Sequence, residues 1–379
     1  MKKTKEVIES PERQFCKLCR EGRLFEAEAW LKAGKPANFE HKNVRCTPLG
    51  IAIASNFHSL LEVLLKNGLK ATVKHFWLAI RLGRVGMIEL MIQQGVEPKW
   101  LNFRDVVDWP NPKILKIFIE QGSDTYTGFP VAEALKRAPR AFLGLYKTYA
   151  DKFPDWKLQA DIALRYFCEE GKLRGVCLML WAGANPRHSV PSKWGEEPEL
   201  WTSSLWQACI CGHAEIVKKI RPNREQDDLD NLLCIAGNGG SAELISYLIS
   251  LGANPNARTK GDGVLRSALW RLKWELDNAQ YCSFSSRYSK ALDVVKRLTE
   301  LGCRLDPKTK DEIQFLRECF IRMKSNELIE LMPFLLQHNF AERKIFLNLM
   351  KIPLIRAQYN WHQPKLYRLF PELKPKKNG

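Results

Sequence analysis

Apolar residues in this chain of 379 residues fall into short segments that recur at intervals of about thirty residues. In each segment a short apolar helix leads through a turn containing Gly or Asn into a second apolar helix, and a polar link follows. The first three segments cover residues 15–34, 49–68 and 76–95. Their apolar positions occupy one helical face, which predicts pairs of helices and not strands.

Glycines close the predicted helix pairs, and their spacing indicates where the repeats are less regular. Gly commonly ends a helix because it adopts the left-handed conformation without a clash at Cβ. The closing glycines are Gly34, Gly68, Gly95, Gly122, Gly183, Gly252 and Gly302. The two longest intervals between them each hold one degenerate copy, at residues 130–150 and 203–220, and the last interval holds an insertion at 277–289.

Each predicted helix pair is too small to bury its apolar face alone, so its stability has to come from neighbouring pairs. This requirement predicts a stack of pairs with a capping segment at each end. We therefore divide the chain into a polar N-terminal segment (1–11), a repeat array (12–340, less regular at 99–160), and a C-terminal cap with a basic tail (341–379).

One copy of the repeat carries a recognisable family pattern. Residues 205–217 read LWQACICGHAEIV and resemble the ankyrin repeat pattern L-H-x-A-x-x-x-G-H-x-E-I-V. Residues 180–186 and 251–256 are similar to the family's closing L-x-x-G-A-D/N-x-N. Residues 47–49 match its T-P-L-H opening, except that Gly50 replaces the His. The resemblance covers about residues 12–340 and points to the repeat fold, not to a particular member.

The resemblance implies a predominantly all-α solenoid of about ten helix pairs. In this family the T-P-L-H tetrapeptide joins successive turns through its Thr and His side chains, and this chain contains only one T-P-L. We therefore expect short or irregular finger loops and uneven curvature. In similar proteins the loops and first helices line a concave surface that binds other macromolecules.

Charge is unevenly distributed along the chain. The formal net charge is +17, from 59 basic and 42 acidic residues. Residues 1–150 carry 24 basic and 15 acidic side chains, residues 151–250 carry 11 and 14, and residues 251–379 carry 24 and 13. Two basic ends favour polyanions, acidic proteins or anionic lipid surfaces as partners.

Cysteine usage and the start of the chain bear on the compartment. Eleven cysteines is an odd number, and several lie inside apolar helical segments, which is typical of reduced thiols that pack as small hydrophobes. Residues 1–6 lead into a charged segment without the apolar core of a signal peptide, and no apolar segment is long enough to span a bilayer. We expect a soluble cytoplasmic protein.

Two cysteine clusters allow a metal or thiol hypothesis beside a structural one. Cys209, Cys211 and His213 look like part of a zinc site, but no second Cys/His pair follows at finger spacing, and all three match the ankyrin helix-turn-helix. Cys16 and Cys19 form a C-x-x-C motif inside the first predicted helix. Packing is the favoured interpretation of both clusters, so we expect no metal site.

Two further motifs allow a ligand-site hypothesis beside a structural one. Residues 237–240, Gly-Asn-Gly-Gly, lack the Lys-Ser/Thr of a phosphate loop and follow a predicted helix, so a turn between paired helices is favoured. Glu225, Asp227, Asp228 and Asp230 lack the spacing of a calcium loop. Asp228 or Asp230 is expected instead to cap the helix that starts near Leu232. No cofactor site and no catalytic residue follow from the sequence.

Residues 266–290 interleave aromatic and basic side chains across the insertion. This mixture suits stacking on bases with charge on phosphates, or an aromatic and Arg hot spot for a protein. The alternative is that Trp270 and Trp274, one helical turn apart, fill the core while Arg271 and Lys273 face water.

These observations favour a non-enzymatic adaptor that binds a protein partner. Nucleic acid or another polyanion is the alternative partner, an enzyme with a noncontiguous site is the second alternative, and the oligomeric state is left open. The expected contact segments are the links at 39–45, 188–201 and 257–263 and the insertion at 277–289. The candidate contact residues are Lys42, Arg45, Trp77, Arg81, Lys193, Trp194, Arg258, Lys260, Arg271, Trp274, Arg287 and Tyr288.

Overall fold

The computed structural model shows a predominantly α-helical chain made of two compact units. The structure describes residues 10–39, 41–96, 103–109, 111–259, 262–278, 286–358 and 363–374. Unit 1 comprises residues 1–163 and 193–195, and unit 2 comprises residues 164–192 and 196–379. The division falls inside helix α11 (Asp155–Glu169) and was not predicted from the sequence.

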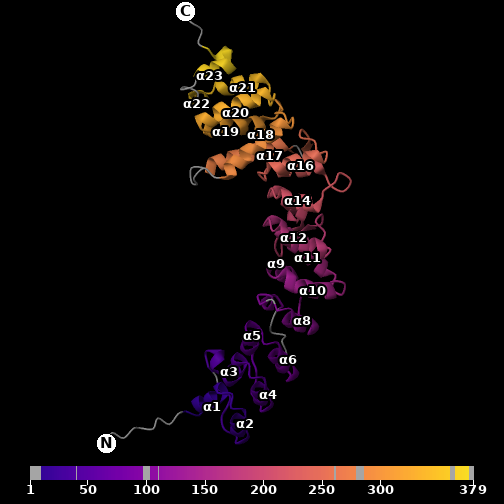
Figure 1. Cartoon of the computed structure of the whole chain (residues 1–379), viewed down its shortest axis with the longest axis vertical. Helices are drawn as coiled ribbons and strands as arrows, with labels where there is room; N and C mark the ends of the chain where they lie inside the picture. The colour runs from indigo at the N-terminus through magenta and orange to yellow at the C-terminus, as the bar shows by residue number, and fades with distance from the viewer. Residues whose placement is uncertain are drawn as a thin grey trace, which may run out of the picture. The chain divides into compact units, whose positions relative to one another are not determined.

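Unit 1 is a stack of helix pairs. Its helices are α1 (Pro11–Arg20), α2 (Leu24–Lys32), α3 (Pro48–Ser55), α4 (His58–Lys66), α5 (Val73–Arg81), α6 (Val85–Gln93), α7 (Phe103–Val106), α8 (Pro112–Glu120), α9 (Pro130–Arg137) and α10 (Pro139–Tyr149). The first helices of successive pairs contact one another, α1 with α3 and α3 with α5, and so do the second helices α2, α4, α6 and α8 (Figure 1). Helices α3, α4 and α6 are thus each sandwiched between their counterparts in the neighbouring pairs.

Unit 2 repeats the same arrangement. Its helices after α11 are α12 (Leu173–Trp181), α13 (Ser204–Ile210), α14 (Ala214–Ile220), α15 (Leu229–Ala236), α16 (Ala242–Ser250), α17 (Val264–Asn278), α18 (Ser286–Glu300), α19 (Lys310–Arg322), α20 (Ser325–Gln337), α21 (Arg343–Met350), α22 (Pro353–Gln358) and α23 (Gln363–Leu369). Helices α13, α15, α17 and α19 form one row of contacts, and α12, α14, α16 and α18 form the other.

Short hairpins and 3₁₀ turns occupy the links between helix pairs. Strand β1 (Ser189–Val190) pairs with β2 (Thr202–Ser203), and β3 (Arg258–Thr259) pairs with β4 (Asp262–Gly263), both antiparallel. The link before α3 instead contains a 3₁₀ turn, η1 (Val44–Cys46). Two further 3₁₀ turns are η3 (Pro198–Leu200) and η5 (Pro371–Leu373). The expected mixture of finger hairpins and irregular loops is therefore present.

Ten helix pairs, α1–α2 through α19–α20, lie within the described residues, which confirms the predicted fold class. The two degenerate copies are α9–α10 and α13–α14. All seven predicted closing glycines have positive φ, between 65° for Gly34 and 101° for Gly252. Where α14 ends without Gly, Arg221 adopts the left-handed conformation (φ 59°) in its place.

The C-terminal segment is helical and partly buried. Phe346, Leu349 and Ile355 are buried, and α22 contacts α19, as a capping segment requires. Leu354, although apolar, is exposed and does not cover the last repeat. The N-terminal residues 1–9 and the tail residues 375–379 lie outside the described residues. No helix in the described part of the chain is long and apolar enough to cross a bilayer.

The opening of α3 explains why the chain departs from the family's T-P-L-H pattern at Gly50. Thr47 caps α3, and its side-chain oxygen accepts from the backbone N–H of Gly50 at 3.1 Å. A Cβ atom on Gly50 would lie 1.8 Å from the carbonyl oxygen of Val44 in η1. The backbone of η1 therefore leaves room only for glycine at this position.

Candidate interaction surfaces

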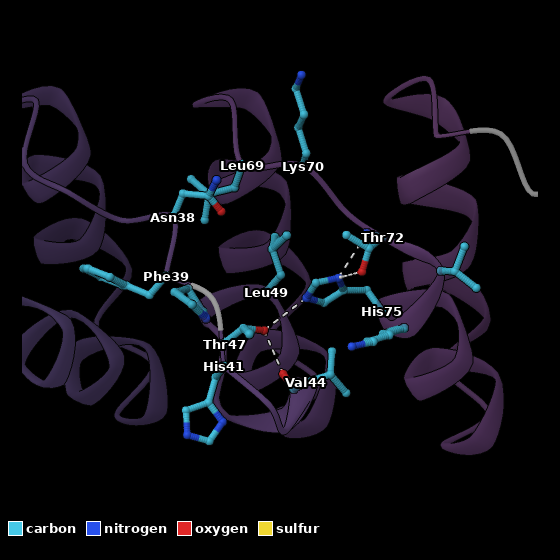
Figure 2. A pocket seen from close by; sticks show the side chains of 13 residues that line it. Asn38, Phe39, His41, Val44, Thr47, Leu49, Leu69, Lys70, Thr72 and His75 are labelled. Atoms are coloured by element: carbon cyan, nitrogen blue, oxygen red, sulfur yellow. Dashed lines mark hydrogen bonds between the residues drawn. The ribbon is translucent and has the colours of Figure 1, made fainter.

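A hollow of about 540 Å³ opens in unit 1 between two successive links, and we call it the link pocket. Its walls are the link before α3, the link between α4 and α5, and the first residues of both α3 and α5. The lining residues are Asn38, Phe39, His41, Val44, Thr47, Pro48, Leu49, Leu69, Lys70, Thr72, Val73, Lys74 and His75. Figure 2 shows Leu49 at the centre and Lys70 extending from the rim. Its volume lies within the range typical of ligand pockets.

Hydrogen bonds to His75 hold the two walls of the link pocket together (Figure 2). The Thr47 hydroxyl donates to the carbonyl oxygen of Val44 at 2.7 Å, so His75 Nε2–H donates to Thr47 Oγ1 at 3.0 Å. Nδ1 of the same ring accepts from the backbone N–H of Thr72 at 3.1 Å and from its hydroxyl at 2.9 Å. Burial lowers the pKa of His75 to about 4, which keeps the ring neutral in this network.

The sequence signal for this network is Thr72-Val73-Lys74-His75, a T-x-x-H that retains the two bonding residues of the family's tetrapeptide. The expectation of a single T-P-L opening overlooked it because Pro and Leu are replaced. His75 therefore supplies the imidazole that Gly50 cannot, from the following helix pair.

Four of the predicted contact residues lie in the first helix pairs of unit 1. Lys42 and Arg45 are exposed on the link that forms one wall of the link pocket. Trp77 is half-buried on α5, and Arg81 is exposed at the end of the same helix, with its guanidinium 5.4 Å from the ring of Trp109. The link pocket thus has basic side chains beside it, while Trp77 and Arg81 do not line it.

A second cluster in unit 1 is aromatic. The ring of Trp194 lies edge-on to Tyr126 and Phe129, with centroid distances of 5.2 and 4.7 Å. Trp194, Tyr126 and the neighbouring Lys193 are exposed, whereas Phe129 is buried. Trp194 and Lys193 are predicted contacts, whereas Tyr126 and Phe129 carry no sequence signal because they lie more than sixty residues earlier in the chain.

In unit 2, Arg258 is occupied within the chain. Its guanidinium bonds the carboxylate of Glu312 at 2.8 Å and the hydroxyl of Thr309 at 2.8 Å. The Glu312 side chain is 1% exposed, so the ion pair joins strand β3 to the buried face of α19. Burial raises the pKa of Glu312 and the Arg258 charge opposes that rise. Lys260, the other predicted contact on this link, lies outside the described residues.

The two tryptophans of α17 do not fill the core, so that alternative is wrong. Trp270 and Trp274 are 41% and 52% exposed and stack on each other with ring centroids 5.8 Å apart. One turn of helix separates them, which places both rings on the same solvent-facing side. The pair is therefore an exposed aromatic surface on a helix whose opposite face is buried.

The basic residues beside this tryptophan pair are paired with carboxylates. Arg271 bonds Glu275 at 2.7 Å, and Lys273 bonds Asp277 at 3.0 Å. Lys273 also lies 3.3 Å from Glu318 of α19. Local charge at this surface is thus largely balanced.

The predicted contact Tyr288 needs correction. It is 5% exposed, and its hydroxyl donates to Glu327 at 2.9 Å, because α18 turns this side chain toward α20. Arg287, its neighbour, is exposed. Residues 279–285, which make up most of the predicted insertion, lie outside the described residues.

The cysteine clusters lie in packed helices. Cys16, Cys19 and Cys209 are buried, and Cys211 is half-buried. Burial raises the pKa of Cys19 to about 12 and raises the pKa of the other three thiols above its ordinary value. A thiol nucleophile or metal ligand needs the opposite shift. The structure thus agrees with the packing interpretation.

His213 and two glycines form a close contact between successive turns. His213 Nε2–H donates to the carbonyl oxygen of Glu169 at 3.0 Å. A Cβ atom on Gly212 would lie 2.2 Å from the carbonyl oxygen of Gly239.

Residues 237–240 form the turn between α15 and α16, as predicted. They follow a helix, whereas a phosphate loop follows a strand.

The acidic group at residues 225–230 is used in structural bonds. Asp227 accepts both guanidinium bonds of Arg187, at 2.9 and 2.8 Å. Asp228 caps α15 through the backbone N–H of Asn231 at 3.0 Å, which confirms the capping prediction, although the helix begins at Leu229. Among the described residues, no three His, Cys, Asp or Glu side chains are grouped to hold a metal ion.

Among known proteins, the chain is similar to solved structures of ankyrin repeat domains. No family model matches the chain, and no curated protein matches it. The human ASB11 ankyrin repeat domain is 17% identical over 73% of this chain and 96% of its own, with a TM-score of 0.23. The ankyrin repeat domain of Bcl-3, a member of the IkappaB family, is 15% identical over 69% and 94%, with a TM-score of 0.31.

The helix pairs, their positive-φ closings and the His75 network make this an ankyrin-like helical-repeat fold.

Proposed function

We propose that this chain is a non-enzymatic adaptor that binds a protein partner through the link pocket and the loops of its helical repeats. The observation that carries this proposal is the link pocket itself, a hollow of about 540 Å³ between two links with an apolar base and a polar rim. Interfaces are anchored where a side chain of one partner enters a desolvated pocket of the other. The exposed pairs Trp194–Tyr126 and Trp270–Trp274 provide further aromatic surface of the type enriched in interfaces.

At the aromatic surface of α17, a protein partner is favoured over nucleic acid because the cations beside the tryptophans are paired with carboxylates. Nucleic-acid binding depends on cations that neutralise phosphates. Arg271 and Lys273, the cations beside Trp270 and Trp274, already bond carboxylates of the chain. An aromatic pair with balanced charge suits a protein surface better than a phosphate backbone.

Binding is favoured over catalysis because the thiols of the two cysteine motifs have pKa values that make them unreactive. Their pKa values are raised by burial, and they lie between packed helices. His75, which lines the link pocket, is held by bonds to Thr47 and Thr72 on both ring nitrogens. A general base needs one of these nitrogens to face the substrate.

The test is retention of a partner from an extract of the source cell on the immobilised full chain. Asn38→Trp places a large ring at the exposed rim of the link pocket, and Gln121→Trp makes a similar change at an exposed site outside it. We expect wild type and Gln121→Trp to retain the same protein after nuclease treatment, and Asn38→Trp to lose it. Equal retention by Asn38→Trp would contradict binding at the link pocket.

A salt series addresses the polyanion alternative. Binding of labelled DNA and RNA is measured by fluorescence at two salt concentrations, with the retained protein as a parallel sample. Phosphate-driven affinity falls steeply with salt. Tight nucleic-acid binding with such a slope, in place of a nuclease-resistant protein, would favour the alternative.

A further inference from the structure

The link between α4 and α5 contributes to the lining of two hollows. One is the link pocket, and the other, also of about 540 Å³, is lined in addition by residues 94–96. Leu69 and Lys70 line both. Hollows that share a wall suit an occupant that crosses from one to the other, such as an extended peptide segment, better than a compact small molecule.

The base of this surface is apolar. Leu49 and Leu69 are buried side chains whose outer atoms line the link pocket, and Val44 and Val73 are half-buried beside them. A pocket lined in this way gains most from an apolar side chain that displaces water from it.

Among the described residues, the charged side chains that line this surface are basic. Lys70 and Lys74 line the link pocket, and the described lining of the two hollows contains no carboxylate. Lys42 and Arg45 are exposed on the facing link. Within the described residues, none of these four cations forms an ion pair, in contrast with Arg258 or Lys273.

Two helices add to the positive potential. α3 and α5 both begin at the link pocket, with Pro48 and Val73 in its lining. The N-terminus of a helix carries a partial positive charge from its aligned peptide dipoles. Unpaired cations and two helix N-termini therefore favour negative charge at the rim while the base favours an apolar group.

We propose that the link pocket binds an acidic segment of a partner protein, with one apolar side chain against Leu49 and Leu69 and flanking carboxylates beside Lys70 and Lys74. This proposal rests on the proposed function and specifies the partner's chemistry. A phosphate backbone would meet the cations and leave the apolar base uncovered. Among the described residues of the lining, the ring of Phe39 is half-buried and that of His75 is buried, so the pocket offers little ring surface besides that of His41 for stacking bases.

The experiment uses synthetic fluorescent peptides with a central Leu or Phe flanked on both sides by Glu, Gln or Lys. Binding to the full chain is followed by fluorescence anisotropy. We expect the Glu-flanked peptides to bind about tenfold more tightly than the Gln-flanked ones, and the Lys-flanked ones not to bind. A Glu-flanked peptide with central Gly should also lose binding, because nothing then enters the pocket.

Charge reversal locates the site. Lys70→Glu/Lys74→Glu should weaken the Glu-flanked peptides about tenfold or more. Lys113→Glu, at an exposed position of the same unit outside the link pocket, should leave them unchanged. Both lysines of the double variant are exposed, so its thermal unfolding should match that of wild type.

The outcomes separate this proposal from the proposed function. If Gln- or Lys-flanked peptides bind as well as Glu-flanked ones, and Asn38→Trp abolishes their binding, the acidic partner is wrong while protein binding at the link pocket stands. If Lys70→Glu/Lys74→Glu binds the Glu-flanked peptides as tightly as wild type does, the proposed site is wrong. If no peptide binds and Asn38→Trp also retains the extract's protein, both proposals fail.

Discussion

Gly50 stands where the ankyrin pattern has a histidine, and the backbone of η1 explains the exchange. A Cβ atom there would lie 1.8 Å from the carbonyl oxygen of Val44. The bond that a histidine would form at position 50 is formed instead by His75, which lies 28 residues after its partner Thr47. The local departure from the pattern therefore leaves the connection between the two helix pairs intact.

Replacing Gly50 tests this close approach. We expect Gly50→Ala to lower the free energy of unfolding by about 1 to 3 kcal/mol, the range for overpacking. Gly144→Ala is the matched control, because Gly144 is helical and has no neighbouring atom within 4 Å of a built Cβ. That change should raise the free energy of unfolding by about 0.5 to 1 kcal/mol. Denaturation followed by circular dichroism measures both, and equal effects would contradict the contact.

His75 predicts a pH dependence of stability. Its pKa is about 4 in the folded chain and 6.5 when exposed, so the unfolded chain binds more protons between these values. Its contribution is therefore fully present above pH 6.5 and is lost as the pH falls toward 4. The stability difference between wild type and His75→Ala should shrink by about 3 kcal/mol between pH 7 and pH 4. A pH-independent difference in urea unfolding would show that His75 is not held neutral.

At the scale of elements, the link hairpin β3–β4 is tied to helix α19 by Arg258 and Glu312. The carboxylate of Glu312 is buried: Arg258 bonds its Oε1 atom, and its Oε2 atom has no hydrogen-bond partner in the described chain. Arg258 therefore stabilises the fold by neutralising a buried carboxylate. Its position on an exposed link had instead predicted contact with a partner.

Removing Arg258 would leave this buried carboxylate without its counter-ion. We expect Arg258→Ala to lower the free energy of unfolding by about 3 kcal/mol, at the lower end for breaking a buried pair because the arginine itself is 32% exposed. Arg266→Ala, which breaks pairs with two exposed carboxylates, those of Asp262 and Asp311, should lower it by less than about 1 kcal/mol. Thermal and urea unfolding measure both variants. A similar small loss for the two would contradict the structural role.

The helix pairs were predictable from the sequence because apolar spacing and closing glycines are local signals. The link pocket was not, because it forms where two links about thirty residues apart meet, and Lys70 and Lys74 read as ordinary surface lysines. The bond between Arg258 and Glu312 spans 54 residues and was hidden for the same reason. Tyr288 was wrongly predicted to be a contact residue, because the insertion before α18 leaves the buried face of that helix undefined in the sequence.

At the scale of the whole molecule, each unit is stabilised mainly by contacts between neighbouring helix pairs. Helix α4 contacts α2, α3 and α6, and helix α16 contacts α14, α15 and α18. In such stacks, stability is roughly a sum of repeat and nearest-neighbour terms. Damage to one pair should therefore spread to its neighbours and leave distant pairs folded.

Buried leucines in each unit test this local response. Leu64 of α4 and Leu248 of α16 are fully buried, and replacement by Ala is expected to cost about 2 to 5 kcal/mol. Leu64→Ala should speed hydrogen exchange in α3–α6 and leave α13–α16 unchanged, and Leu248→Ala should do the reverse. Uniform acceleration along the whole chain in either variant would contradict nearest-neighbour stabilisation.

Hydrogen exchange of the full chain, alone and with its retained protein partner, tests most directly whether function lies in the link pocket. Binding there should slow exchange at residues 41–47 and 69–75, which form its two walls. Asn38→Trp should remove this protection, and Gln121→Trp should preserve it. Protection confined to other parts of the chain, or none at these two links, would contradict the proposed function.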